Sequence, residues 1–268
     1  MNPKLDDTEE KMNHDESAVK AQYASSANLS TRISIHAKYS TNKQGFGNWI
    51  AAHYPISAGM SVLELGCGTG EIWLNQRALV ENCSSIILTD FSEGMLEKAK
   101  DTLKMYPNIE YAVVDIQNIP YADNSFDIVI ANMMLYHVPD IPKGLSEVRR
   151  VLRDGGTFCC ATYGENGIME YLAGLFREYG VKEEANHTFT LQNGKAQLQK
   201  FFHEVERYDY EDSLEVTDMN DLADYISSLT GMSSLRALPR ETIIQVLSEA
   251  AADGMLRVPK EYGMFLSR

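Results

Sequence analysis

The stretch VLELGCGTGEIW, residues 62–73, decides how this chain folds. Four residues of strand type lead into Gly66, and glycines then occupy every second position at Gly66, Gly68 and Gly70. Glycine lacks a Cβ, so its backbone can adopt positive φ and approach a ligand closely. A glycine-rich turn between a strand and a helix therefore predicts one wall of a nucleotide-binding site.

The spacing of these glycines differs from the dinucleotide fingerprint. The G-x-G-x-x-G pattern places its third glycine one residue later than Gly70, and Glu71 stands where that pattern needs a small residue. A carboxylate there, with Glu64 just before the turn, would repel a pyrophosphate. The turn thus favours a ligand whose contacting end is cationic or zwitterionic, and it disfavours a nicotinamide-dependent oxidoreductase.

Apolar strands alternate with helices over the next hundred residues. We expect strands at 61–66, 85–90, 109–115, 126–135 and 157–163, helices at 71–80, 92–106 and 141–152, and a turn at 154–156. This alternation predicts an α/β fold with a Rossmann-like, doubly wound, mostly parallel sheet and helices on both faces. Such sheets bind ligands beyond the carboxyl ends of their strands, where the glycines, Asp90 and Asp115 would converge.

The segments on either side of this core are expected to complete it. Residues 1–17 should form a flexible acidic tail, 18–58 an N-terminal helical lid, 59–164 the core, and 165–268 a helical cap with the closing strands of a seven-stranded sheet. Helices are expected near 167–180, 194–204, 219–229 and 240–252, and strands at 205–216 and 262–268. A helical insertion between two closing strands fits this order better than an independent second domain.

Composition limits the classes of function. The 268 residues carry a formal net charge of −14 and no basic cluster, so nucleic-acid binding has no source of phosphate neutralisation. The four cysteines form no CxxC pair and lie near no histidine cluster, so we expect no metal site and free thiols in a reducing compartment. Without a signal peptide or an apolar run of membrane-spanning length, a cytoplasmic protein with no membrane partner is expected.

The pattern E-x-G-x-G-x-G at the end of the first strand resembles motif I of the class I S-adenosylmethionine (SAM)-dependent methyltransferases. Further segments resemble the later motifs of that family, in order and at matching spacings: DFSEGMLEKAK at 90–100, VVDIQNIPYADNSFDIVIANMMLYHVPD at 113–140 and EVRRVLRDGGTF at 147–158. The resemblance covers residues 61–163. It implies methyl transfer, with SAM as cofactor and S-adenosylhomocysteine (SAH) as product.

The resemblance also implies which strand ends contact the nucleoside of SAM. Asp90 stands where the family places the acid that holds the ribose hydroxyls. Phe91 and Met95 occupy the positions that flank adenine, and each could instead be part of the core. Asp115 and Ile116 sit where the adenine amino group is met.

The methionine end of SAM is implied to lie beside the first and fourth strands. Asn132 and Met133 occupy the end of the fourth strand, although Asn132 could simply cap it. The first strand and its turn add the remaining cofactor-binding candidates of the core: Glu64, Gly66, Cys67, Gly68 and Gly70. Cys67 is expected to contact the ligand only through its backbone.

The catalytic candidates are His137, Tyr39 and His36. His137 follows the fourth strand, where similar methyltransferases often carry a histidine facing the acceptor or the cofactor; it could also pack on the next helix. If residues 32–46 are helical, Arg32, His36 and Tyr39 share one face. Relatives that act on small molecules lay such a segment over SAM, so Arg32 and Tyr39 are also cofactor candidates. A helix packed on the sheet is the alternative.

The expected function is methyl transfer to an N or O atom of a small-molecule acceptor. That acceptor would bind between the lid and the cap, where the sequence offers the aromatic residues Phe46, Trp49, Tyr163, Tyr171, Phe176, Phe189, Phe201 and Tyr225. The alternatives are a methyltransferase acting on a protein side chain or RNA, and a SAM-binding protein without catalysis. The acceptor, the oligomeric state and the roles of His137 and Tyr39 as base or pocket wall stay open.

Overall fold

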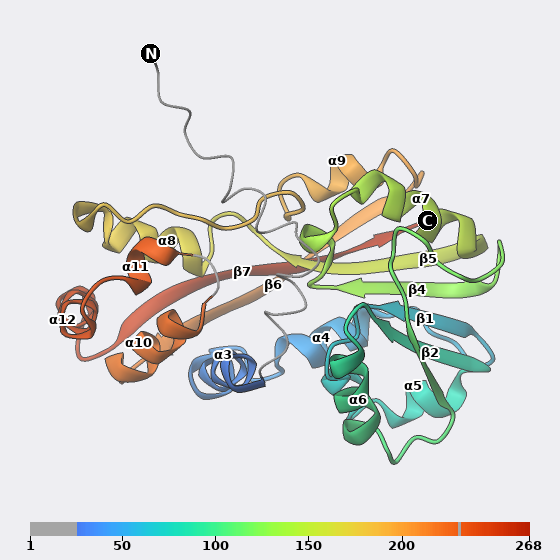
Figure 1. The fold of residues 1–268 in the computed structure, drawn as a ribbon, viewed down its shortest axis with the longest axis horizontal. Helices are drawn as coiled ribbons and strands as arrows, with labels where there is room; N and C mark the ends of the chain where they lie inside the picture. The colour runs from blue at the N-terminus through green and yellow to red at the C-terminus, as the bar shows by residue number, and fades with distance from the viewer. Residues whose placement is uncertain (1–25, 230–231) are drawn as a thin grey trace. The chain divides into compact units, whose positions relative to one another are not determined.

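The computed structural model describes residues 26–229 and 232–268 (Figure 1). The chain divides into two compact units: unit 1 holds residues 55–158 with Arg268, and unit 2 holds residues 26–54 and 159–267. The tail expected at 1–17, and the first part of the expected lid at 18–25, lie outside the described residues.

Unit 1 is built on four apolar strands. They are β1 (Ser61–Leu65), β2 (Ser85–Asp90), β3 (Ile109–Val113) and β4 (Phe126–Asn132). β1 pairs in parallel with both β2 and β4, and β2 pairs in parallel with β3. β4 ends earlier than the sequence predicted, because Met133 adopts φ 52 and so leaves the extended region. The parallel sheet predicted from the alternating pattern is confirmed.

The helices of unit 1 follow the strands as expected, with one difference. They are α5 (Arg77–Asn82), α6 (Glu93–Thr102) and α7 (Ile141–Val151), with 3-10 turns η1 (Glu71–Trp73) and η2 (Leu135–His137). The single helix expected at 71–80 is wrong: η1 and α5 are separated at Gln76, whose φ of −105 and ψ of 40 are not helical. The start of α6 is confirmed, since the Ser92 hydroxyl caps it by accepting the Met95 N–H.

Unit 2 combines helices with a long antiparallel pair of strands. Its helices are α3 (Ser26–Tyr39), α4 (Phe46–His53), α8 (Ile168–Leu175), α9 (Gly194–Leu198), α10 (Met219–Ser228), α11 (Ser233–Arg236) and α12 (Arg240–Ala250), with the turn η3 (Arg177–Tyr179). β6 (Val205–Val216) pairs with β7 (Leu256–Ser267) along its whole length. This pairing explains why the last strand begins six residues before the predicted start at 262. Buried side chains from α3, α8, α10, α12, β6 and β7 form one core.

All seven strands are hydrogen-bonded in the order β3-β2-β1-β4-β5-β7-β6. β5 (Leu152–Tyr163) contains the turn expected at 154–156, and Gly155 passes through it at φ 77, a conformation that glycine tolerates without steric cost. The chain winds outward from β1 to β3 and then returns to β4 on the other side of β1. The Rossmann-like fold is thereby confirmed, with its switch point at the carboxyl ends of β1 and β4.

Candidate active site

The glycine turn after β1 combines two tightly packed positions with one open position. Gly66, Gly68 and Gly70 have φ values of 72, 56 and 74. A Cβ added to Gly70 would lie 2.7 Å from Leu103 Cδ1, and one added to Gly66 would lie 3.0 Å from Met134 Cγ. No atom lies within 4 Å of the corresponding position at Gly68. Gly68 is therefore the place where a ligand can approach the backbone of the turn.

Asp90, at the carboxyl end of β2, lies against this turn. Its Oδ2 accepts the Gly68 N–H at 2.9 Å, and its Oδ1 accepts the Ser92 N–H at 2.8 Å. Burial raises the pKa of Asp90, although these backbone donors oppose the rise. Burial also raises the pKa of the neighbouring Cys67 well above its usual value, so the thiol stays protonated and is a poor nucleophile.

Glu64 joins three elements of unit 1 inside the core. Its side chain is buried, with 1% of the residue exposed. One carboxylate oxygen accepts the indole N–H of Trp73 at 2.6 Å, and the other accepts the Asn132 amide at 3.3 Å. Burial raises the pKa of Glu64 to about 7, against the effect of both hydrogen bonds. Glu64 thus holds the end of β1 to η1 and to the end of β4.

The end of β4 and its connection to α7 carry three of the predicted site residues: Asn132, Met133 and His137. Asn132 is buried, and Met133 adopts the left-handed region at φ 52. A non-glycine residue held there costs on the order of 1–3 kcal/mol, a strain found most often at functional sites. The His137 N–H donates to Met134 O at 2.9 Å, and its ring lies 4.5 Å from that of Tyr136.

The end of β3 supplies a second carboxylate, next to residues that are packed in the core. Asp115 accepts the Gln117 N–H at 2.8 Å. Ile116 is buried against Gly144 of α7, where an added Cβ would come within 3.3 Å of the isoleucine. Met95 is also buried in α6. Asp115 is therefore the polar candidate at this strand end, whereas Ile116 and Met95 contribute apolar packing.

Phe91 completes the predicted set in unit 1. It follows Asp90 directly and is half-buried. The Val114 N–H donates to Asp90 O at 3.2 Å and brings the chain after β3 beside the end of β2. Unit 1 thus gathers the glycine turn and the strand-end residues predicted from the sequence at one edge of its sheet.

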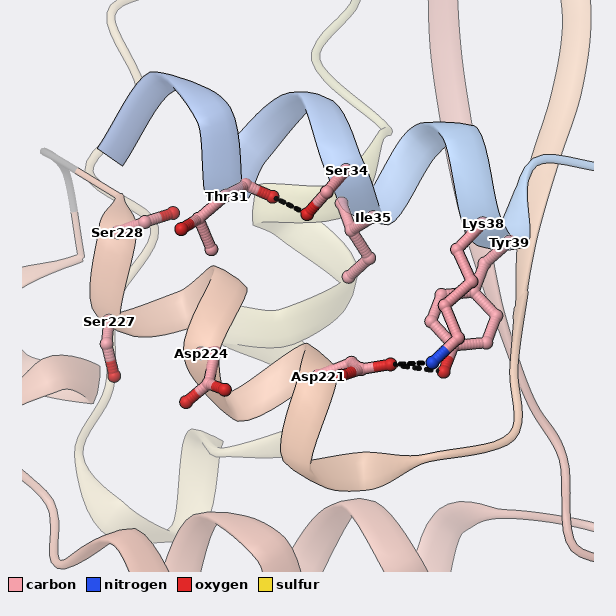
Figure 2. Close-up of a pocket in the computed structure, with 9 residues that line it drawn as sticks. All are labelled: Thr31, Ser34, Ile35, Lys38, Tyr39, Asp221, Asp224, Ser227 and Ser228. Carbon is pink, nitrogen blue, oxygen red and sulfur yellow. Dashed lines mark hydrogen bonds and ion pairs between the residues drawn. The ribbon is translucent and has the colours of Figure 1, made fainter. Parts of the chain in front are cut away.

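Arg32, His36 and Tyr39 lie on α3 in unit 2, so the helix predicted for them is confirmed. Tyr39 is 6% exposed, and its hydroxyl donates to Asp221 of α10 at 2.5 Å. The Lys38 ammonium contacts the same carboxylate oxygen at 2.5 Å (Figure 2). These two contacts fasten the C-terminal end of α3 to α10.

A cavity of about 480 Å³ lies between α3 and α10. Figure 2 shows its lining, which is mostly hydroxyl and carboxylate groups: Thr31, Ser34, Ile35, Lys38, Tyr39, Asp221, Asp224, Ser227 and Ser228. Several of these groups are already bonded within unit 2; Ser228 Oγ, for example, donates to Tyr225 O at 2.6 Å.

His36 occupies an apolar and aromatic environment. Its ring meets those of Tyr225 and Tyr262 edge-on, with centroids 6.0 Å and 6.1 Å away. Burial, and then the nearby Lys260 ammonium, lower the pKa of His36 to about 3, although the Asp212 carboxylate opposes the change. The imidazole is therefore neutral at physiological pH.

A buried ion pair lies next to His36. Lys260 of β7 contacts Asp212 of β6, with side chains 3% and 0% exposed. The same ammonium donates to Ser40 Oγ at 2.9 Å, and the Asn42 N–H donates to Asp212 at 2.9 Å. The pair therefore ties the connection between α3 and α4 to both strands.

Sequence reasoning missed several residues that shape these sites. Trp73 follows the glycine turn closely in the sequence, and a buried indole N–H needs an acceptor. That requirement could have indicated its pairing with Glu64. Asp221 is 182 residues from Tyr39 in the chain, and no local pattern connects them. Lys260 and Tyr262 lie on β7, whose predicted start came too late to reveal its pairing with β6.

Within residues 26–229 and 232–268, no group of three or more His, Cys, Asp or Glu side chains could hold a metal ion. Over the same ranges, no helix has both the length and the apolar character needed to cross a membrane.

Comparisons with known proteins point to one activity. The family model described as "Methyltransferase domain" matches residues 63–160. Demethylmenaquinone methyltransferase from Staphylococcus aureus (strain MRSA252) is 27% identical over 166 residues, which make up 56% of this chain and 69% of that protein. The ubiquinone/menaquinone biosynthesis C-methyltransferase UbiE from Rickettsia prowazekii is 34% identical over 118 residues, which make up 41% of this chain and 48% of that protein. The chain thus spans less than half the length of some curated relatives.

A solved structure supports the fold. A putative methyltransferase from Bacillus halodurans superposes with a TM-score of 0.55 at 17% identity, over 82% of this chain and 96% of that one. The family match falls on the segment that contains the glycine turn, Asp90, Asp115 and Asn132. Residues 63–160 therefore form a methyltransferase domain, and SAM is its cofactor.

Proposed function

We propose that this SAM-dependent methyltransferase transfers the methyl group to an N or O atom of a small-molecule acceptor. The observation that carries the proposal is the open backbone position at Gly68, bonded to the Asp90 carboxylate. The name of the Staphylococcus aureus relative gives demethylmenaquinone as its substrate, and that of the Rickettsia prowazekii relative refers to quinone biosynthesis, which supports a small acceptor. The acidic balance of the chain argues against RNA. A cytoplasmic location is part of the same proposal.

The residues of unit 1 fit SAM. Carboxylates accept hydrogen bonds from ribose hydroxyls and an adenine amino group, which suits Asp90 and Asp115. The backbone at Gly68 and the Asn132 amide would hold the methionine end, with Glu64 fixing the orientation of that amide. SAM, when bound, supplies an electrophilic methyl group attached to a sulfonium. The acidic surroundings suit a cation better than a phosphate.

The protein contributes orientation above all. Aligning an acceptor lone pair with the methyl carbon and excluding water can supply up to about 7–11 kcal/mol of the barrier reduction. His137, on the connection after β4, is the candidate to take a proton from the acceptor. We assign Arg32, His36 and Tyr39 to the N-terminal helical lid at 18–58, and the acceptor to the side of the cap at 165–268.

Carbon is the second candidate for the acceptor atom. The relative from Rickettsia prowazekii is named a C-methyltransferase. An electron-rich ring carbon would attack the methyl group as the bond from methyl to sulfur breaks, and the attacked carbon would then lose its ring proton. His137 is again the candidate to take that proton. NMR of the methylated product distinguishes O–CH3, N–CH3 and C–CH3 groups directly.

Calorimetric titration with SAM, SAH and NADH tests the cofactor assignment. We expect micromolar binding of SAM and SAH that is lost in Asp90→Ala. Asp101→Ala is the matched control, because its carboxylate is 82% exposed on α6 and should not affect binding. Binding of NADH instead, or no binding of SAM or SAH, would contradict the proposal. An acceptor screen that follows SAH release would then test the small-molecule assignment.

A further inference from the structure

A groove of about 720 Å³ lies on unit 2, where the end of α3 and the connection to α4 run beside β6 and β7. Its lining combines hydroxyl groups with four charged side chains: Lys38, Lys43, Arg257 and Glu215. All the residues that line it belong to unit 2, so the groove is complete within that unit. Its volume is that of a site for a small molecule.

The polar face of β6 and β7 forms the floor of this groove. Ser213 and Glu215 are two residues apart on β6 and so point to the same side, whereas Leu214 and Val216 are buried in the core. Arg257 lies opposite Glu215 in the register of the two strands, so their side chains share one face. Burial of the alternate residues therefore fixes these polar groups toward the groove.

The chain that follows α3 forms one side of the groove, and hydrogen bonds hold it against β6. The Thr41 N–H donates to Ser213 O at 2.9 Å, and the Ser213 N–H donates to Thr41 Oγ1 at 3.1 Å. Lys38 and Lys43 lie on either side of this anchored stretch, and both are exposed. Their ammonium groups are thus attached to a fixed backbone and have room to reach a ligand.

The charge of the groove is opposite to that of the whole chain. Three cationic side chains and one carboxylate line it, whereas the chain has a formal net charge of −14. Lys43 forms no ion pair within residues 26–229 and 232–268. Clustered positive charge raises the local concentration of anions, so the groove attracts a ligand that most of the molecular surface repels.

The other two cations are paired, but their pairs lie at the surface. Lys38 contacts Asp221 at 2.5 Å, and Arg257 contacts Glu215, while the two cationic side chains are 58% and 68% exposed. Exposed ion pairs contribute little to stability, and each of these cations has more N–H donors than its one contact uses. Both cations can therefore turn donors toward a ligand at small cost.

We infer that this groove binds a small molecule through a phosphate or carboxylate group, held by Lys38, Lys43 and Arg257. The planar guanidinium matches the two oxygens of either group, and the ammonium groups add charge. An uncharged or cationic ligand would leave these donors without a match. The site goes beyond the methyl transfer proposed above, because the residues assigned to SAM in the core lie in unit 1 and the groove lies in unit 2.

Calorimetric titration of the full chain at neutral pH and constant ionic strength tests the inference. The probes are pyrophosphate, inorganic phosphate and citrate, with the uncharged triethyl ester of citrate as the matched control. We expect at least one anion to bind one-to-one with a Kd below about 1 mM, and the ester not to bind. Tighter binding of pyrophosphate than of citrate identifies a phosphate ligand, and the reverse order identifies a carboxylate ligand. Failure of all three anions, or binding of the ester as tight as that of citrate, would overturn the inference.

Charge-removing variants locate the bound anion. Lys43→Ala and Arg257→Ala should each weaken binding of the tightest probe by about threefold to tenfold, the loss of one donor. Lys195→Ala and Arg77→Ala are the controls, because each removes one positive charge from an exposed residue outside the groove; Arg77, like Arg257, is paired with a carboxylate. Lys43 lies in a turn, so Lys43→Ala keeps the test valid even if Arg257→Ala does not fold. Unchanged affinity in Lys43→Ala, or an equal loss in the controls, would contradict the inference.

Titration with and without saturating SAH separates the groove from the cofactor site. Binding of the anion should be the same in both conditions. If SAH abolishes it, the anion occupies the cofactor site and the inference fails. The SAM titration described above is a separate measurement: failure of SAM to bind would refute the proposed function alone, and failure of the anions to bind would refute only the groove.

Discussion

The Glu64→Gln variant tests whether the charge that Glu64 places at the cofactor site lowers the stability of unit 1. Glu64 is buried between Trp73 and Asn132, and these are the two side-chain donors to its carboxylate among residues 26–229 and 232–268. Glutamine keeps the shape and a carbonyl oxygen for the indole N–H of Trp73. Rotation of the Asn132 amide lets it accept from the new side-chain N–H. The variant therefore removes the charge without opening a cavity.

The magnitude follows from the pKa of Glu64. A rise from 4.5 in the unfolded chain to about 7 in the folded one corresponds to about 3 kcal/mol. The folded state binds the proton more tightly, so this stability is fully present below about pH 4.5 and is lost as the pH rises through 7. Glutamine does not titrate. The free energy of unfolding of Glu64→Gln relative to wild type should thus increase by up to about 3 kcal/mol between pH 5 and pH 8.

Urea unfolding of both proteins at pH 5, 6, 7 and 8 measures this difference, with Glu71→Gln as control because Glu71 is exposed in η1. At pH 8 the more stable Glu64→Gln protein should bind SAM more weakly than wild type, since it lacks the negative charge. The affinity of wild type for SAM should increase as the pH rises through 7. Parallel stability profiles of wild type and Glu64→Gln would refute the reasoning.

Three further changes probe other parts of the two units. Trp73→Phe should lower the free energy of unfolding by about 1–3 kcal/mol at pH 8 in urea titrations, because the buried Glu64 carboxylate loses a donor. An equally large loss of unfolding free energy at pH 5 would contradict this cause. Gly68→Ala and Gly59→Ala both place alanine at positive φ with no atom nearby, so equal melting temperatures are expected, with SAM affinity lost only in Gly68→Ala. Lys260→Met should lower the free energy of unfolding by about 3–5 kcal/mol, because it leaves Asp212 buried and without its ion-pair partner. Adding Asp212→Leu should restore most of that stability in thermal unfolding. If stability does not recover in the double variant, the loss does not come from the unpaired Asp212 charge.

The sequence by itself determined the fold of unit 1 and the cofactor. Apolar runs ending in Glu64-Leu65, Asp90 and Asp115 specify parallel strands and their carboxyl ends, because burial on both faces requires continuous apolar residues. The alternate glycines specify a turn that a side chain would obstruct. These are local patterns, and each can be interpreted within about a dozen residues.

Only the tertiary structure decided which groups in the interior lack or find partners. Glu64 pairs with Trp73 because η1 turns the indole inward, and burial raises the pKa of the carboxylate although this hydrogen bond lowers it. His36, Tyr225 and Tyr262 come from segments that are far apart in the chain. Their common neighbourhood depends on how α3, α10 and β7 pack, and burial and distance between remote residues are properties that a local sequence pattern does not encode.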